Sequence, residues 1–190
     1  MIERMTDEGV GTATKLSLET TLPTADAVRY VTVDSGLGCV LVARSENGVR
    51  AILFGDDAAT LADDLQARMS STKLEDGDDQ CSYDAATVAA HIDDPSVPLD
   101  FTLDAQGTPF QQRVWKALRA IPAGMTISYG ELARQVGAPE SVRAVASACG
   151  ANPIALAVPC HRVVSKDGSL GGYRWGVERK RALLDREKRS

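Results

Sequence analysis

The feature that most constrains the fold is a change of pattern near residue 100. Before it, turn residues separate three short apolar segments, 28–33, 39–43 and 49–54. Asn47-Gly48 lies between the last two and is a strong hairpin signal, because both residue types tolerate positive φ. After residue 108, apolar residues recur at helical spacing instead. We therefore expect an α+β chain in which a small, three-stranded antiparallel sheet precedes a mainly helical region.

The segments that follow the predicted sheet complete its layer. Apolar spacing predicts helices over 58–69 and 85–92. The acidic segment 70–80 is predicted to be a solvated loop, because its carboxylates lack the spacing of a calcium loop. Segment 99–103 has the pattern of a strand or a linker that leads into the helical region.

The length and hydropathy of the chain bound its organisation. A chain of 190 residues with 44% hydrophobic residues can hold one ordinary domain or two small ones. We expect a disordered leader over 1–24, an α/β domain over 25–104 and a helical domain over 105–190. No apolar run approaches the roughly 20 residues of a membrane span, and the polar N-terminus does not resemble a signal peptide. We therefore expect a monomeric protein of the cytoplasm that has no membrane partner.

Charge is distributed unevenly along the chain, whose formal net charge is −5. Residues 1–100 carry 7 Lys/Arg against 19 Asp/Glu, whereas residues 101–190 carry 14 against 7. Such asymmetry indicates a polyanionic partner for the basic part. The alternative is a solvated C-terminal helix, because many of the basic residues cluster in 179–189.

A helix-turn-helix pattern lies within the basic part. Residues 128–131 have the form of a capping box that opens a helix through Val136. After a four-residue turn, a second helix over 141–149 stops at Gly150. Except for Arg143, its side chains are no larger than valine. Such small side chains allow close approach to a nucleic-acid groove, but they suit tight packing in a core equally well.

The segment 159–164, Pro-Cys-His-Arg-Val-Val, has the composition of a nucleophile site. Cysteine reacts as the thiolate, and its ordinary pKa of about 8.5 leaves few thiols ionised at neutral pH. His161 and Arg162 can supply a base and positive charge beside Cys160. The alternative is that Cys160 is a small buried hydrophobe at the end of the apolar run 154–158. No C-x-x-C pair occurs and the chain has only two histidines, so we expect neither a metal site nor a disulfide.

Taken together, five ordered motifs between Phe110 and Glu187 resemble those of the O6-alkylguanine-DNA alkyltransferases. The motifs are Ile127-Ser128-Tyr129, Val142-Arg143-Ala144-Val145, Asn152-Pro153, Pro159 to Val164, and Gly171-Gly172-Tyr173-Arg174-Trp175-Gly176. The acidic first half resembles the N-terminal domain of that family more weakly. The resemblance implies direct, irreversible transfer of an alkyl group from damaged guanine, and possible action on O4-methylthymine, without any cofactor.

The resemblance also implies catalytic roles. Cys160 corresponds to the alkyl acceptor, and Glu187 to the carboxylate that holds His161. Neighbouring side chains of an extended segment point to opposite faces, so we expect a water to bridge Cys160 and His161. Tyr129 corresponds to the proton donor near O6 of the departing guanine.

Duplex DNA is the partner that the resemblance implies. The target nucleotide leaves the stack, and Arg143 fills its place from the minor groove. The predicted DNA contacts are Tyr129, Ser141, Arg143, Ala144, Ala148 and Arg162. Around the base we expect Asn152 to tie the second helix to the nucleophile loop and Tyr173 to line the pocket. Trp175 is predicted to narrow that pocket, which favours methyl over benzyl-sized groups.

Two other functions are compatible with parts of this pattern. A thiol hydrolase needs a directly paired histidine and an oxyanion hole, and the histidine nearest to Cys160 in sequence is its immediate neighbour. A non-catalytic helix-turn-helix module explains the basic part but gives no role to segment 159–164. Turnover of an ester and a gain of mass at Cys160 distinguish these alternatives from alkyl transfer.

Overall fold

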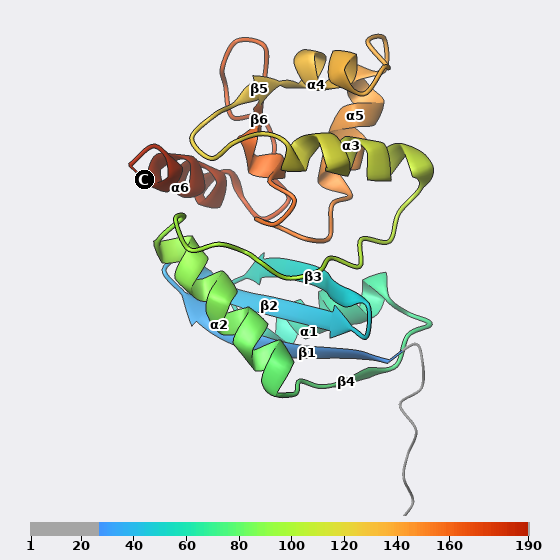
Figure 1. Ribbon diagram of the computed structural model, residues 1–190, viewed down its shortest axis with the longest axis vertical. Helices are drawn as coiled ribbons and strands as arrows, with labels where there is room; N and C mark the ends of the chain where they lie inside the picture. The colour runs from blue at the N-terminus through green and yellow to red at the C-terminus, as the bar shows by residue number, and fades with distance from the viewer. Residues whose placement is uncertain (1–26, 190) are drawn as a thin grey trace, which may run out of the picture.

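The computed structural model describes residues 27–189 and has two layers (Figure 1). A sheet with its helices forms one layer, and the C-terminal helices form the other. The predicted leader, 1–24, lies outside the described residues. Within the described part, no helix is both long and apolar enough to cross a membrane.

The sheet contains the predicted antiparallel meander of three strands. β1 (Val28–Ser35) pairs with β2 (Gly38–Ser45), which pairs with β3 (Gly48–Gly55). β2 is buried along most of its length because it lies between two neighbours. The hairpin turn falls on residues 46–47, one position earlier than predicted, and Gly48 begins β3 with φ +139°. The hairpin is therefore confirmed with a shifted turn.

The acidic segment 70–80 was wrongly predicted to be a loop throughout. Its centre forms β4 (Leu74–Asp76), which pairs in parallel with β1, so the strand order is β3-β2-β1-β4. A strand of three residues is too short to show alternating polarity, and backbone pairing with the edge of β1 determines its conformation.

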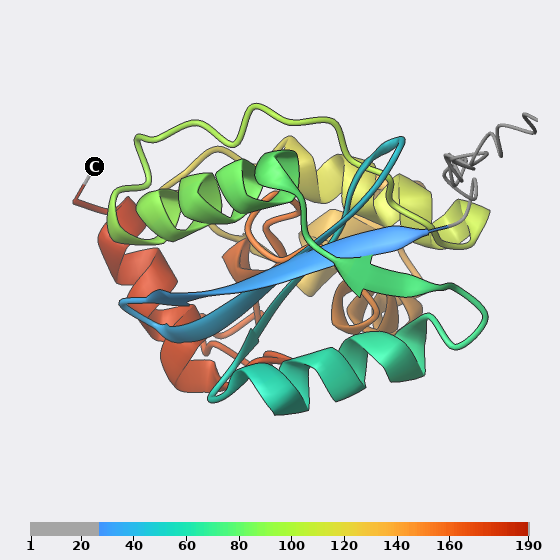
Figure 2. The same ribbon diagram turned by 90° about the horizontal axis from the view of Figure 1, so that it is seen from below.

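Two helices pack against this sheet (Figure 2). α1 (Ala58–Arg68) packs on β2 and β3, and α2 (Asp79–Asp93) packs on β1 and β2. α2 begins six residues before the predicted start. Its N-cap, Asp78, accepts a hydrogen bond from the backbone N–H of Cys81, which lets the acidic segment open the helix.

The C-terminal layer consists of helices joined by short connections. These are α3 (Pro109–Arg119), α4 (Tyr129–Gln135), α5 (Val142–Gly150) and α6 (Val177–Glu187). Ser128 and Glu131 form the predicted capping box of α4, and α4 with α5 forms the predicted helix-turn-helix. Two short strands, β5 (Ile127–Ser128) and β6 (Val163–Val164), pair in parallel between the helices.

The two layers are joined through the outer edge of β3. The backbone of Ile52 donates to the carbonyl of Pro153 and accepts from the N–H of Ala155, both at 3.0 Å. Val49 makes a similar pair of bonds to segment 102–104. Segment 99–103, predicted to be a strand or a linker, is thus a linker with a single bridge at Leu103. Buried apolar residues of both layers form one continuous cluster. The segment leading to Cys160 is thus anchored on the sheet edge.

Candidate active site

A tight turn brings Cys160 from the sheet edge to the site. Two residues after the bridge at Ile154, Leu156 adopts a left-handed conformation with φ 66°. This conformation is unfavourable for a bulky residue, and burial of Leu156 in the core holds it in place. The chain then enters a single 3₁₀ turn, η1 (Cys160–Arg162). The expectation of an extended segment at Cys160 was therefore wrong.

Asn152 links the end of α5 to this turn. Its side chain is fully buried and donates to the carbonyl of Val158 at 2.8 Å and to Sγ of Cys160 at 3.3 Å. Its Oδ1 accepts from the backbone N–H of Ile154 at 2.9 Å. These bonds fix the loop and direct a donor at the sulfur, which stabilises a thiolate.

His161 and Glu187 form a buried pair behind the cysteine. Nε2 of His161 lies 2.7 Å from Oε1 of Glu187, and both side chains are almost fully buried. Burial lowers the pKa of His161, and the bond to Glu187 offsets part of this shift. Burial raises the pKa of Glu187, but bonds from His161 and Arg162 outweigh it and lower that pKa to about 2. The pair is thus a neutral imidazole held by a carboxylate.

The other ring nitrogen of His161 is available. Nδ1 is buried and has no hydrogen-bond partner among residues 27–189. A buried nitrogen without a partner is costly unless it bonds a water or a reacting group. Its position on the residue after Cys160 suits the predicted water bridge.

Arg162 does not lie where a DNA contact is needed. Its Nε and Nη2 donate to Glu187, and its Nη1 donates to the carbonyl of Ile121 at 2.6 Å. The side chain is only 11% exposed. The predicted DNA-binding role of Arg162 was therefore wrong, because its guanidinium is used to hold Glu187.

Cys160 lines a cavity of about 450 Å³. Tyr129 and Tyr173 line it as well, together with Cys149 and Gly150 of α5. Burial raises the pKa of Tyr129 to about 12, so the phenol keeps its proton at neutral pH. Two predicted site tyrosines thus surround the predicted nucleophile.

Trp175 lies outside this cavity, contrary to prediction. Its buried indole packs edge-on against Phe54, with 6.2 Å between ring centroids, and against Tyr173 at 5.2 Å. The indole therefore supports Tyr173 from the core instead of narrowing the pocket. Gly171 and Gly172 line the cavity and leave this part of its wall without side chains.

Lys180 of α6 is a site residue that the sequence interpretation missed. It is fully buried, and its Nζ donates to the carbonyls of Val163, at 2.6 Å, and Leu170. Burial raises the pKa of Cys160, while the bond from Asn152 and the charge of Lys180 oppose that rise. Residues 180, 183, 184 and 187 recur on the buried face of α6, and this spacing was the available signal.

α5 presents a small, basic face to solvent. Arg143 and Ala144 are exposed and Ser141 is partly exposed, as the DNA-binding prediction requires. No carboxylate of the described residues pairs with Arg143. Ala148 points into the core instead, and its carbonyl accepts a bond from Nε1 of Trp115 at 2.9 Å. Ala148 was therefore wrongly assigned to the DNA contact.

Comparison with known proteins gives a consistent result. The family model of the DNA-binding domain of 6-O-methylguanine DNA methyltransferase matches residues 109–189. The solved structure of Mycobacterium tuberculosis OGT in complex with DNA is 39% identical with a TM-score of 0.70, covering 86% of this chain and 93% of that one. This chain belongs to the O6-methylguanine DNA methyltransferase family. The family match confirms the predicted fold class.

Curated members of the methyltransferase family are also similar in sequence. The bifunctional transcriptional activator/DNA repair enzyme Ada of Escherichia coli is 52% identical over 161 residues, which are 85% of this chain and 46% of Ada. The methylated-DNA–protein-cysteine methyltransferase of Mycobacterium bovis is 62% identical over 89 residues, 47% of this chain and 54% of that protein. The chain thus matches about half the length of these curated relatives.

Proposed function

We propose that this chain repairs DNA by transferring an alkyl group, methyl above all, from O6 of guanine to Sγ of Cys160. The observation that carries the proposal is a thiol that lines a cavity and is backed by a buried histidine–carboxylate pair. The names of the similar proteins, which include methylated-DNA–protein-cysteine methyltransferase, support the same reaction. The proposal includes O4-methylthymine as a second substrate.

Proton transfer begins at the thiol. Cys160 is protonated at rest because burial raises its pKa, whereas His161 is neutral because burial lowers its pKa. A water that bridges Sγ and the unpartnered Nδ1 of His161 carries the proton to the ring. Glu187 stabilises the imidazolium that forms, and Arg162 holds Glu187 in place.

Alkyl transfer follows as an in-line displacement. The S–C bond forms while the bond between the alkyl carbon and O6 breaks, and the electron pair moves onto the guanine ring. Tyr129 donates a proton to the ring, and the proton that left Cys160 replaces it. The products are a thioether and unmodified guanine. A thioether does not regenerate a thiolate, so each molecule acts once, and the donor is the lesion itself, so no cofactor is needed.

Access to the alkyl carbon requires eversion of the nucleotide, because a stacked base cannot enter the cavity. α5 adjoins the cavity through Cys149 and Gly150 and exposes Arg143 on its outer face. We propose that α5 enters the minor groove of duplex DNA and that Arg143 occupies the vacated position. A monomer in the cytoplasm carries out this reaction.

Two rival functions fit the site less well. For a thiol hydrolase, the bonding of His161 Nε2 to Glu187 leaves only Nδ1, on the residue next to the nucleophile. For a DNA-binding module without chemistry, the bond from Asn152 to Sγ and the His161–Glu187 pair have no use.

The test follows the lesion in a duplex that contains O6-methylguanine. We expect chromatography of the digested DNA to show loss of one lesion per protein molecule and then no further loss. Cys160→Ser abolishes the loss, whereas the control Cys81→Ser, at a buried position of α2 outside the cavity, retains it. Repeated turnover, turnover of an ester, or DNA binding without any loss of lesion contradicts the proposal.

A further inference from the structure

Arg174 lies where the cavity of Cys160 opens to solvent. The side chain lines the cavity and is 40% exposed, whereas the cysteine is 6% exposed. Its Nη1 donates to the carbonyl of Gly150, the last residue of α5, at 3.1 Å. The guanidinium of Arg174 therefore lies between the end of α5 and the mouth of the cavity.

This guanidinium shares one carboxylate with a second arginine. Asp64 of α1 lies 2.7 Å from Nη2 of Arg68 and 3.9 Å from Nη2 of Arg174. Both guanidinium groups lie within 4 Å of this carboxylate, and burial together with the charge of Arg68 lowers the pKa of Arg174. Nε of Arg68 is buried without a hydrogen-bond partner in the described structure. Two cations against one anion leave this cluster positive.

The position of Arg174 offsets an unfavourable feature of α5. The C-terminal end of a helix carries partial negative charge on its last carbonyls, which repels anions. Gly150 ends α5 beside the cavity, so a phosphate arriving there meets such carbonyls. The bond from Nη1 of Arg174 to the carbonyl of Gly150 covers part of that charge, while Nη2 faces Asp64 at 3.9 Å without a hydrogen bond and can turn to an arriving anion.

We propose that Arg174 binds the DNA phosphate that flanks the everted nucleotide, and that Asp64 of α1 holds the guanidinium in readiness before DNA arrives. This inference rests on the proposed function, because a base inside the cavity leaves its own phosphates at the mouth. Arginine suits this role, since its planar fork binds phosphate through two N–H groups. The N-terminal layer thereby contributes to DNA recognition through α1.

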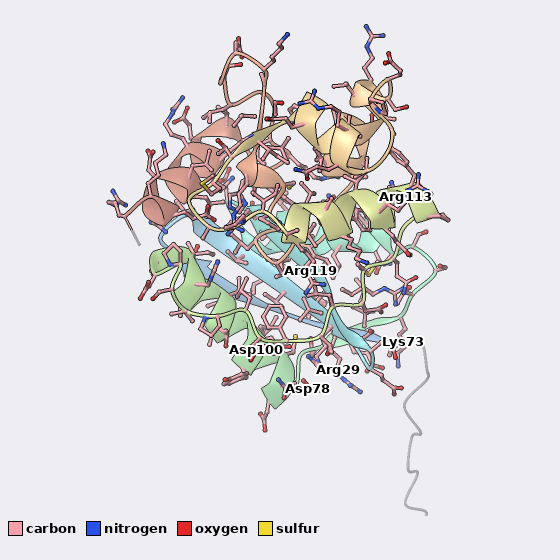
Figure 3. All side chains as sticks on the ribbon, turned by 45° about the horizontal axis from the view of Figure 1, so that its top comes forward. Arg29, Lys73, Asp78, Asp100, Arg113 and Arg119 are labelled. Carbon is pink, nitrogen blue, oxygen red and sulfur yellow. The ribbon has the colours of Figure 1, made fainter. Side chains whose placement is uncertain are left out.

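The test compares two substrates that differ in their phosphates. Alkyl transfer is timed with a duplex that contains O6-methylguanine and with the free base O6-methylguanine, which has none. We expect Arg174→Ala to lower the ratio of duplex rate to free-base rate roughly tenfold and to reduce the salt slope of duplex binding by about one. Asp64→Asn lowers the same ratio to a smaller extent, because the guanidinium of Arg174 is then no longer held at the cavity mouth. Lys73→Ala is the charge-matched control, because Lys73 pairs with Glu75 beside β4, away from the C-terminal layer (Figures 1 and 3).

Several outcomes overturn this inference. The first is an unchanged ratio of duplex rate to free-base rate in Arg174→Ala. The second is an equal fall of the transfer rate with both substrates, which indicates that Arg174 acts in the cavity itself. If Arg174→Ala does not fold, the proposal is tested with Asp64→Asn alone. An unchanged ratio of duplex rate to free-base rate in that variant contradicts the proposal. Failure of the proposed function has a different signature, because the parent protein then transfers alkyl groups from neither substrate.

Discussion

The two layers of the molecule use their positive charges differently. Every Lys or Arg between residues 27 and 104 pairs with a carboxylate. In the C-terminal layer, eight basic residues have no carboxylate of the described chain at ion-pair distance: Arg113, Lys116, Arg119, Arg134, Arg143, Lys166, Lys180 and Arg189. Lys180 is buried and donates to backbone carbonyls, whereas the other seven are exposed. Figure 3 labels Arg113 and Arg119 on α3 of this layer, and Arg29 and Asp78, a pair of the other layer. The first layer pairs all of its cations within its own structure, whereas the second leaves these seven exposed and without an ion pair, as the proposed binding of DNA requires.

Among the paired cations of the C-terminal layer, one buried cluster gives the largest expected effect. Glu187→Ala leaves Arg162 without its buried carboxylate, and we expect the free energy of unfolding to fall by about 4 kcal/mol. Glu178→Ala is the matched control on α6, because Glu178 also pairs with an arginine but is 78% exposed. Its loss costs about 0.5 kcal/mol or less. Urea unfolding of both variants measures these changes. Equal falls in the free energy of unfolding contradict the account.

Arginines of the two layers give the next largest effects, of opposite kinds. Arg44 pairs at 2.6 Å with the buried carboxylate of Asp84, so Arg44→Ala lowers the free energy of unfolding by about 3 kcal/mol. Arg143→Ala leaves stability unchanged and weakens binding to a lesion duplex roughly 30-fold, because nothing fills the vacated stack. Thermal unfolding and fluorescence anisotropy on both variants measure the two effects. If Arg44→Ala weakens binding of the folded protein as strongly as Arg143→Ala, the contrast between layers is wrong.

The pH dependence of stability extends the comparison, because buried and exposed carboxylates change the free energy of unfolding by different amounts when they are protonated. The pKa of Glu187 is about 2 in the folded protein, below its ordinary 4.5, so its stabilisation is complete above pH 4.5 and is lost as pH falls toward 2. This loss amounts to about 3 kcal/mol. The lowered pKa of His161 acts in the same direction and begins below pH 6.5.

Unfolding free energies measured between pH 7 and 2 test this prediction. Glu187→Gln flattens the acid part of the curve. Glu75→Gln, in the N-terminal layer, flattens the curve much less, because that carboxylate is 28% exposed and solvent screens the bond from Lys73 that lowers its pKa. Equal flattening by both substitutions contradicts the assignment of the acid response to the buried pair.

The smallest predicted effect concerns the buried cation beside the thiol. Lys180→Met removes a charge that opposes the raised pKa of Cys160, so the rate of alkyl transfer falls roughly tenfold and its pH profile moves to higher pH. Free O6-methylguanine is the substrate, so that DNA affinity does not enter. Lys116→Met, which replaces an exposed residue of α3, leaves the pH profile of the transfer rate unchanged. A fall in rate without movement of the profile indicates a structural role only.

Features that depend on residues close together in the sequence were predicted, and features that depend on distant residues were not. The meander, the capping box of α4 and the helix-turn-helix depend on short-range patterns, and the structure has them. β4 was missed because its pairing with β1 is long-range. The division into domains over 25–104 and 105–190 stays a prediction.

The same distinction applies to the site. The family resemblance identified residues that the structure places around Cys160, among them Asn152, His161 and Glu187. The direction of a side chain was not predictable in the same way. Arg162 and Trp175 lie beside site residues in the sequence but point into the protein, and the burial of Lys180 was not predicted. Which face of η1 is buried depends on tertiary packing, whereas the spacing of residues 180, 183, 184 and 187 on α6 was a local signal that the sequence interpretation did not use.

The central claim is that Cys160 takes the alkyl group and keeps it. The most direct measurement is the mass of the intact protein, with peptide mapping, after incubation with a duplex that contains O6-methylguanine. The account predicts a gain of one CH₂ unit per molecule, located on the peptide that contains Cys160, and no gain in Cys160→Ala. An unchanged mass in the presence of excess damaged duplex, or a gain on another residue, contradicts it.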